Sequence, residues 1–300
     1  MTLACRIGVQ LPEVERYVPM ADYLDLARRA EDAGFDSVWV GDHLLYDLPH
    51  GATRGPWEAW TTLAAIAAVT SRVELGPLVA STAFHAPAML AKQAATVDAI
   101  SDGRLVLALG AGWNRREFDA FGFPYDRRVS RFAEALTIVH ALLRDGRTSY
   151  AGQFYAVDDC VLDPRPARDV PLVLGSNSPR MLAIGLPLVD AWNVWWSVYD
   201  NSAARFASIK AEVDAAAPAG RTVEATACVL VTLPGGQGRV MGESYDAPVA
   251  TVTLDSLAEH LQAMAEAGAS HLQLVLDPIT ADSIDAVGRV VSAARAAPRG

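Results

Sequence analysis

The stretch Arg104-Leu-Val-Leu-Ala-Leu109, followed by Gly110-Ala111-Gly112, decides the fold that we expect for this chain. Its apolar run predicts a strand buried on both faces, and it is the fourth such run from the N-terminus. A matching junction closes the fifth run, in Pro171-Leu-Val-Leu-Gly-Ser-Asn-Ser178. Strand ends that open into glycine and small polar residues bring backbone N–H groups close to a phosphate. Two such junctions predict a phosphorylated cofactor at the mouth of a β/α barrel.

Apolar runs alternate along the whole chain with segments whose apolar residues recur at helical spacing. The sequence contains eight expected strands, and each is followed by an expected helix. This pattern predicts an α/β fold with a closed (β/α)8 TIM barrel, and a doubly wound open sheet is the alternative. We expect one domain over residues 1–300, because barrels of about 250 residues form a single domain. The expected strands are Arg6–Leu11, Ser37–Asp42, Val73–Ser81, Leu105–Gly110, Leu172–Ser176, Ala191–Trp195, Ala225–Thr232 and Leu272–Asp277.

Two stretches break this repeat. Thr148–Pro171 contains a turn at Gly152 and is predicted to form a small hairpin and linker before the fifth strand. Leu233–Val252 contains Pro-Gly-Gly-Gln-Gly and few apolar residues, which predicts a long loop after the seventh strand. Loops of that length are either functional lids or disordered, and both interpretations stay open.

Composition narrows the class of protein. The chain is 51% hydrophobic over 300 residues, enough to bury a full core, and its formal net charge of −10 gives no electrostatic support for a nucleic-acid partner. We find no apolar stretch of about 20 residues that would predict a membrane span, and Met1–Leu11 lacks a signal-peptide pattern. Cys5, Cys160 and Cys228 are widely spaced and odd in number, which favours a reduced, cytoplasmic protein.

The second strand ends in the best acid–base candidate, Asp42-His43. Catalytic residues of β/α barrels lie at the carboxyl ends of the strands, and a histidine with a pKa of about 6.5 exchanges protons near neutral pH. A neighbouring carboxylate orients such a ring, although adjacent strand residues point to opposite faces. The structural alternative is a capping Asp42 and a His43 bonded to a backbone carbonyl. The position at a strand end favours a catalytic role.

The fifth strand ends in the best phosphate candidate, Gly175-Ser176-Asn177-Ser178. Ser178 is placed to cap a helix that begins at Pro179, which leaves backbone N–H groups and Arg180 for a phosphate. An ordinary N-cap with a surface arginine is the alternative. Gly110 and Gly112 alone are a weak signal, since Arg115 stands where the dinucleotide fingerprint has its third glycine.

Aromatic residues at the strand ends are expected to wall an apolar pocket. Trp195 and Trp196 follow the sixth strand at the rim, whereas Trp192 is expected to be a packing residue. Arginines 127, 128 and 131 are expected on a solvated face rather than in an anion site. The predicted substrate pocket consists of Tyr46, Trp113, Trp195 and Trp196, beside His43.

Other chemistries have little support. A Schiff-base enzyme needs a lysine at a strand end, and Lys92 and Lys210, the only lysines, fall in expected helices. No paired histidine or cysteine metal-ligand motif is present. A metal-dependent hydrolase barrel with scattered ligands remains the alternative of another class, and a cofactor-free binding barrel is a third. The scattered ligands would be Asp42, His43, His85 and Asp277.

Taken together, several segments resemble the bacterial luciferase-like superfamily, whose members bind FMN or the deazaflavin F420. The resemblance covers nearly the whole chain, and its signal lies in the order and spacing of the segments. They are Ala30-Glu-Asp-Ala-Gly-Phe-Asp-Ser-Val-Trp-Val-Gly-Asp-His43, Thr70-Ser-Arg-Val-Glu-Leu-Gly-Pro77, His85-Ala-Pro-Ala-Met-Leu-Ala-Lys-Gln93, Ile100-Ser-Asp-Gly-Arg-Leu105, Gly110-Ala-Gly-Trp-Asn114 with Glu117, and Asp190-Ala-Trp-Asn193.

The resemblance implies a (β/α)8 barrel with the cofactor ring at its carboxyl face. It implies a non-prolyl cis peptide at Leu78–Val79 that backs the ring, a cofactor border along Gly110-Ala111-Gly112 and Asn114, and a phosphate site at Gly175–Ser178 with Arg180. It also implies a homodimer.

The resemblance also indicates which of the two cofactors to expect. Asp42-His43 is similar to the F420-dependent members, and F420 is therefore our expectation, with FMN as the alternative. Trp113 stands where the F420-linked sugar-phosphate dehydrogenases have a glutamate, and Asp47 where they have a tryptophan, so a sugar phosphate is not expected. We expect hydride transfer between F420 and a small, apolar organic substrate, with His43 moving the proton. The alternative is an FMN-dependent monooxygenase that uses reduced flavin and O₂.

Overall fold

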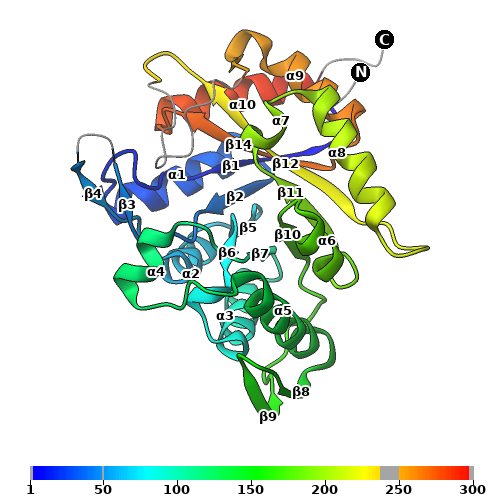
Figure 1. Cartoon of the computed structure of the whole chain (residues 1–300). Helices are drawn as coiled ribbons and strands as arrows, with labels where there is room; N and C mark the ends of the chain where they lie inside the picture. Colours follow the sequence, from blue (N-terminus) through cyan, green and yellow to red (C-terminus); the bar gives the residue numbers. More distant parts are fainter. Residues whose placement is uncertain (1–2, 49–50, 237–249, 297–300) are drawn as a thin grey trace.

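The computed structural model describes residues 3–48, 51–236 and 250–296. Its main sheet is entirely parallel, in the order β5-β2-β1-β14-β12-β11-β10-β7-β6, and it curls into the predicted barrel (Figure 1). The strands are β1 (Arg6–Gln10), β2 (Ser37–Val40), β5 (Glu74–Pro77), β6 (Ala80–Ser81), β7 (Leu107–Gly110), β10 (Leu172–Gly175), β11 (Ala191–Val194), β12 (Glu224–Thr232) and β14 (His271–Asp277). Each lies at a predicted run, within a few residues of the expected bounds.

The third predicted strand is split in two, and the barrel closes there. Strand β5 pairs with β2 along its length, whereas β6 pairs with β7. Leu75 accepts from Val106 N at 2.9 Å and donates to Arg104 O at 3.1 Å, which joins β5 to the chain entering β7. Between the halves, the Leu78–Val79 peptide is cis, as the family resemblance implied.

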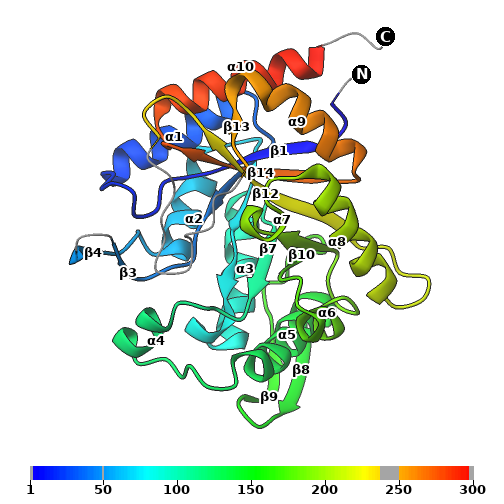
Figure 2. The ribbon, with the colours of Figure 1, turned by 45° about the horizontal axis from the view of Figure 1, so that its top comes forward.

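Helices follow the barrel strands and cover their outer faces (Figure 1). Their inward residues recur at helical spacing, so that Phe132, Leu136, Val139 and Leu143 of α5 are all buried. Helices α1, α9 and α10 lie side by side along one flank (Figure 2). The helices are α1 (Met20–Asp32), α2 (Ala59–Val69), α3 (Pro87–Ile100), α4 (Arg115–Phe121), α5 (Arg128–Asp145), α6 (Pro179–Gly185), α7 (Trp196–Tyr199), α8 (Ala203–Ala216), α9 (Leu254–Glu266) and α10 (Ala281–Ala296), with the 3-10 turn η2 (Thr82–Phe84).

Short hairpins stand outside the barrel. Strands β8 (Arg147–Ala151) and β9 (Ala156–Val161) pair antiparallel, which confirms the hairpin predicted before the fifth barrel strand. A second hairpin, β3 (Tyr46–Asp47) with β4 (Thr53–Arg54), follows β2. Of the long loop predicted at 233–252, residues 237–249 lie outside the described residues, and β13 (Val252–Thr253) follows them.

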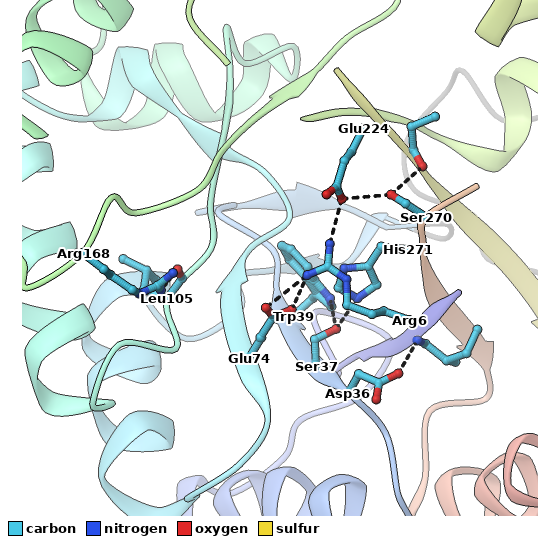
Figure 3. A network of polar contacts seen from close by, with 12 residues as sticks. Arg6, Asp36, Ser37, Trp39, Glu74, Leu105, Arg168, Glu224, Ser270 and His271 are labelled. Atoms are coloured by element: carbon cyan, nitrogen blue, oxygen red, sulfur yellow. Dashed lines mark hydrogen bonds and ion pairs between the residues drawn. The ribbon is translucent and has the colours of Figure 1, made fainter. Parts of the chain in front are cut away.

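The amino end of the barrel is sealed by a polar network (Figure 3). Arg6 of β1 forms ion pairs with Glu74 of β5 at 3.0 Å and with Glu224 of β12 at 2.9 Å, and so ties three strands together. Inside this seal, His271 Nε2 and Ser37 Oγ are 2.7 Å apart. Burial, helped by the charge of Arg6, lowers the pKa of His271 to about 3. The amino end of the barrel is thus closed by paired polar side chains.

No helix in the described part of the chain is both long and apolar enough to cross a membrane.

Candidate functional site

A cavity of about 450 Å³ opens at the carboxyl ends of the barrel strands, where catalytic residues of this architecture lie. It is walled by the ends of β2, β5, β7, β10 and β11 and by the loops that follow them. Most of the residues predicted for the site meet here. The predicted residues that line it are Asp42, His43, Tyr46, Leu78, Val79, Gly110, Ala111, Gly112, Trp113, Gly175, Ser176, Asn177, Trp195 and Trp196.

Three predicted cofactor residues do not line the cavity. Asn114 caps α4, accepting from Arg116 N at 3.2 Å, and its amide donates to Leu45 O at 2.8 Å. Ser178 is the N-cap residue of α6, as expected, but its side chain makes no capping hydrogen bond. Arg180 is exposed and donates to Ser130 Oγ at 2.8 Å, which links α6 to α5. These three residues therefore lie outside the cavity lining.

His43 is oriented by Glu117, a residue that the sequence analysis placed in a motif but did not assign to the site. The Nδ1 atom of His43 lies 3.0 Å from Glu117 Oε1, and the same oxygen accepts from Leu44 N at 2.7 Å and Leu45 N at 3.1 Å. Glu117 is 1% exposed. A carboxylate held by two amides fixes the ring with Nδ1–H toward Glu117, which leaves Nε2 for proton exchange.

Asp42 has a different partner from the one that the sequence suggested. Its Oδ2 accepts from Ser81 N at 2.8 Å and lies 2.9 Å from His85 Nε2. Consecutive residues of an extended chain point to opposite sides, so Asp42 does not orient His43. Asp42 instead fastens β6, just after the cis peptide, to the end of β2.

The charges around His43 favour its protonated form. Burial alone lowers the pKa of an imidazole, but the hydrogen bond to Glu117 and the negative charges of Glu117, Glu13 and Asp42 outweigh it and raise the pKa of His43. Glu13 follows β1, lines the cavity and is 8% exposed. Sequence reasoning missed Glu13, since nothing in the sequence marks a carboxylate three residues beyond a strand.

Aromatic rings form one side of the cavity. The His43 ring lies 4.7 Å from that of Tyr46 and 5.7 Å from that of Trp113, measured between centroids. Trp113 remains 42% exposed at the rim. The rings of Trp195 and Trp196 have centroids 3.8 Å apart and are tilted by 33°, on the wall formed after β11. Tyr46 and Trp113 thus lie beside His43, and Trp195 and Trp196 line the same cavity.

The cavity floor is shaped to receive a flat, polar group. A Cβ on Gly110 would lie 2.7 Å from Val79 Cγ2, and a Cβ on Gly175 would lie 2.6 Å from the same atom, so Val79 sits between two glycines. Ser81 Oγ and Trp195 Nε1 are buried at this cavity without a hydrogen-bond partner in the described chain. Buried polar atoms of this kind call for a ligand or water partner. The donor set fits an isoalloxazine or deazaflavin ring.

Arg128 corrects the expectation of a solvated arginine face. It lines the cavity, stacks on the Tyr125 ring at 3.7 Å and donates from Nε to Gly112 O at 3.2 Å. Arg128, and not the expected Arg180, therefore shares the cavity lining with Ser176 and Asn177. The fold of the loop before α5, rather than sequence spacing, brings it there.

No group of three or more histidine, cysteine or acidic side chains within the described residues is arranged to hold a metal ion. His85 is instead engaged with Asp42, and His43 with Glu117.

Comparison with known proteins identifies the family. The family model described as luciferase-like monooxygenase matches residues 4–234. The chain belongs to this family. Its similar proteins include monooxygenases and F420-dependent dehydrogenases, so it is a member of a family of oxidoreductases.

The similar proteins include both monooxygenases and F420-dependent dehydrogenases. Pyrimidine monooxygenase RutA of Serratia proteamaculans is 30% identical over 76% of this chain and 64% of its own length. The F420-dependent glucose-6-phosphate dehydrogenase of Microbacterium testaceum is 33% identical over 60% of this chain and 53% of its own length. The chain thus spans less than two thirds of these relatives. An F420-dependent secondary alcohol dehydrogenase in complex with an F420-acetone adduct shares the fold, with a TM-score of 0.77 and 21% identity over 97% of this chain and 99% of that one.

Proposed function

We propose that this luciferase-like protein is an F420-dependent oxidoreductase that transfers a hydride between the deazaflavin and a small organic substrate. The observation that carries the proposal is the His43–Glu117 pair at the cavity. A two-electron transfer to or from a carbonyl or alcohol also moves one proton. A histidine held by a buried carboxylate beside the ring site supplies that proton transfer.

The residues divide into those that hold the cofactor and those that act on the substrate. Val79, flanked by Gly110 and Gly175, would back the ring, and Ser81 Oγ would bond to it. Ser176, Asn177 and Arg128 would take its phosphate. The bound cofactor supplies the electron-pair chemistry.

His43 Nε2 would accept the proton of an alcohol during oxidation, or return it during reduction. The rings of Tyr46 and Trp113 would orient the substrate over the ring and exclude water. Glu117 stabilises the imidazolium that forms when the proton arrives.

An FMN-dependent monooxygenase is the second candidate. It is favoured by the length of the match to the pyrimidine monooxygenase, which covers 76% of this chain against 60% for the F420-dependent dehydrogenase. The same residues would hold FMN, with Val79 backing its ring and Arg128 and Ser176 taking its phosphate.

Fluorescence titration of the purified protein with F420 and with FMN tests the proposal. We expect micromolar or tighter binding of F420 and weak binding of FMN. The reverse order would establish the second candidate, and binding of neither would overturn both. Riboflavin and the phosphate-free deazaflavin serve as matched controls, because loss of the phosphate should weaken binding if Arg128 and Ser176 receive it.

We also propose that the protein is a homodimer. Its support, beyond the family resemblance, is the exposure of two large apolar side chains on α3, Met89 and Ile100, which are 56% and 44% exposed. Burial of such side chains against a second copy would stabilise a dimer. Sedimentation velocity would test the proposal, and a monomer at micromolar concentration would contradict it.

A further inference from the structure

The loop that carries Trp113 is tied to the start of α5 through two neighbouring carbonyl groups. Gly112 O accepts from Arg128 Nε at 3.2 Å, and Trp113 O accepts from the hydroxyl of Tyr125, also at 3.2 Å. Both donors belong to the chain that enters α5. The backbone of the loop is therefore coupled to the position of these two side chains.

Arg128 and Tyr125 form one unit. The Cζ atom of Arg128 lies 3.7 Å from the centroid of the Tyr125 ring, and its Nη1 donates to Tyr125 O at 3.1 Å. The same ring lies edge-on to Phe118, with 5.1 Å between the centroids. A guanidinium packed on a ring face is attracted to the ring electrons, so the two side chains are expected to move together. A displacement of the guanidinium is thus passed to both carbonyl groups of the loop.

The loop has little room to yield toward the barrel. Gly112 has a φ of +73°, and a Cβ at this position would lie 2.5 Å from Ser81 Oγ and 2.7 Å from Phe118 Cζ. Closely packed interiors transmit a displacement rather than absorb it. A pull on Gly112 O is therefore expected to reach the next residue, Trp113.

Trp113 lies at the end of this chain of contacts. Its ring is 5.7 Å from the His43 ring and 6.3 Å from the Tyr46 ring, measured between centroids, and it is 42% exposed at the rim. Under the proposed function, on which this step rests, these rings orient the substrate over the cofactor. A change at Arg128 thereby reaches the wall that receives the substrate.

Arg128 also has the chemistry to respond to an anion. Within the described residues its hydrogen bonds and ring contact are with neutral groups, namely the carbonyls of Gly112 and Tyr125 and the Tyr125 ring. These two hydrogen bonds leave further guanidinium N–H groups for a ligand. Arg128 lines the cavity together with Ser176 and Asn177, where an anion would gain charge-assisted hydrogen bonds from it. The position of the guanidinium and the binding of an anion are therefore linked.

We infer that Arg128 is a positioning residue that transmits the binding of the cofactor's phosphate to Trp113. The phosphate fixes the guanidinium, the guanidinium and Tyr125 fix the two loop carbonyls, and these fix the Trp113 ring. The cofactor thus completes the substrate wall before the substrate binds. Because coupling between two sites is reciprocal, a substrate that packs on Trp113 tightens the binding of the cofactor by the same factor.

Fluorine NMR of the tryptophan rings tests the coupling. The protein carries 5-fluorotryptophan at its seven tryptophans, and the Trp113 resonance is assigned by its loss in Trp113→Phe. Inorganic phosphate should shift this resonance and leave that of Trp39, at the sealed amino end, in place. F420 should place the Trp113 resonance differently from the phosphate-free deazaflavin. A Trp113 resonance that neither inorganic phosphate nor the cofactor's phosphate moves would overturn the inference.

Two variants separate the links of this chain. Tyr125→Phe keeps the ring under Arg128 but removes the hydroxyl that donates to Trp113 O. Phosphate should therefore bind with about wild-type affinity, while most of the Trp113 shift is lost. Arg128→Gln should weaken phosphate binding about tenfold or more and abolish the shift. A full shift in Tyr125→Phe would contradict the inference, and this variant still decides the question if Arg128→Gln fails to fold.

Arg180→Gln is the matched control. It removes an equal charge from α6, but Arg180 is exposed, lies outside the cavity lining and donates to Ser130 Oγ rather than to the loop. The Trp113 shift at saturating phosphate should therefore equal that of wild type. Equal losses in Arg128→Gln and Arg180→Gln would show that net charge, and not the contact with Gly112 O, moves the ring, and would overturn the inference.

The same measurements separate this inference from the proposed function. A protein that binds neither F420 nor FMN, but whose Trp113 resonance follows inorganic phosphate through Arg128, would contradict the proposed function alone. A protein that binds F420, but whose Trp113 resonance is the same with the phosphate-free deazaflavin and with inorganic phosphate absent or present, would contradict the coupling alone.

Discussion

The single residue that the proposed chemistry depends on most is His43, since its ring reaches the cavity and its Nδ1 is committed to Glu117. We predict that His43→Ala lowers turnover by about 10² or more, the usual contribution of general acid–base catalysis. Cofactor affinity should change little, because Val79 and Arg128 form other walls. Steady-state kinetics and a binding titration would check this. His140→Ala, on the outer helix α5, is the control, and full turnover in His43→Ala would contradict the proton-transfer role.

Glu117 acts through His43, so replacing its carboxylate should change the pKa of the His43 ring. Glu117→Gln keeps the shape and an acceptor for Leu44 N, but we predict that it lowers the pKa of His43. NMR titration of the ring measures this directly. Because folding raises the pKa of His43, its protonation stabilises the folded protein fully at pH values below the unfolded pKa of about 6.5. This stabilisation is lost as the pH rises through the folded pKa.

The unfolding free energy gives a second readout for Glu117→Gln. The gap between wild type and variant should be largest below about pH 6.5 and should narrow in alkali. Urea unfolding across that range would measure it. A gap that widens with pH would contradict the ion pair.

At the residue scale, the sequence predicted which residues gather but not how they pair. His43, Tyr46 and Trp113 follow strand ends, and topology alone carries them to one rim. The orienting carboxylate of His43 lies 74 positions away, on helix α4. Arg128 enters the cavity because of a loop conformation. Side-chain direction of this kind depends on tertiary packing, which spacing does not encode.

The elements that shape the site are strand ends packed around Val79. Because a Cβ at Gly175 would lie 2.6 Å from Val79 Cγ2, we predict that Gly175→Ala lowers the unfolding free energy by about 1–3 kcal/mol. In a Val79→Ala background the cost should be smaller, with a coupling of about 0.5–3 kcal/mol. Urea unfolding of the four proteins of this cycle measures the coupling. Additive costs would show that the two residues do not press on each other.

The same scale explains why the strands could be located from the sequence. Strands covered on both faces are continuously apolar. The apolar runs of β7 and β10 each end at a glycine, Gly110 and Gly175, and this marks the end of each strand in the sequence. The break between β5 and β6 was expected only through the family resemblance. No local pattern of Leu78–Val79 distinguishes a cis bond from a trans bond.

At the scale of the whole molecule, the barrel separates a sealed end from a working end. Arg6, Glu74 and Glu224 close the amino end with paired charges, whereas His43, Glu117 and Arg128 line an open cavity at the other. Stability and function are thus placed at opposite ends of the same strands, as is usual in this architecture. Substitutions at the sealed end should change stability and spare ligand binding.

That separation leads to a prediction for His271, which lies in the sealed end with a pKa of about 3. Its folded pKa lies below the unfolded value of about 6.5, so between these two pH values the unfolded chain binds one more proton. The unfolding free energy therefore falls with acidification, by about 1 kcal/mol per pH unit from this residue.

We predict that His271→Gln, which keeps a partner for Ser37 Oγ, is less stable than wild type at neutral pH because it loses the contact with the Trp39 ring at 5.7 Å. Its stability should decline less steeply in acid, so that the two curves converge. Urea unfolding at several pH values between about 7 and 4.5 measures both slopes. The packing cost of the substitution is the same at every pH, so it does not affect the slope of unfolding free energy against pH. Parallel curves for wild type and variant would show that His271 is not held neutral by the fold.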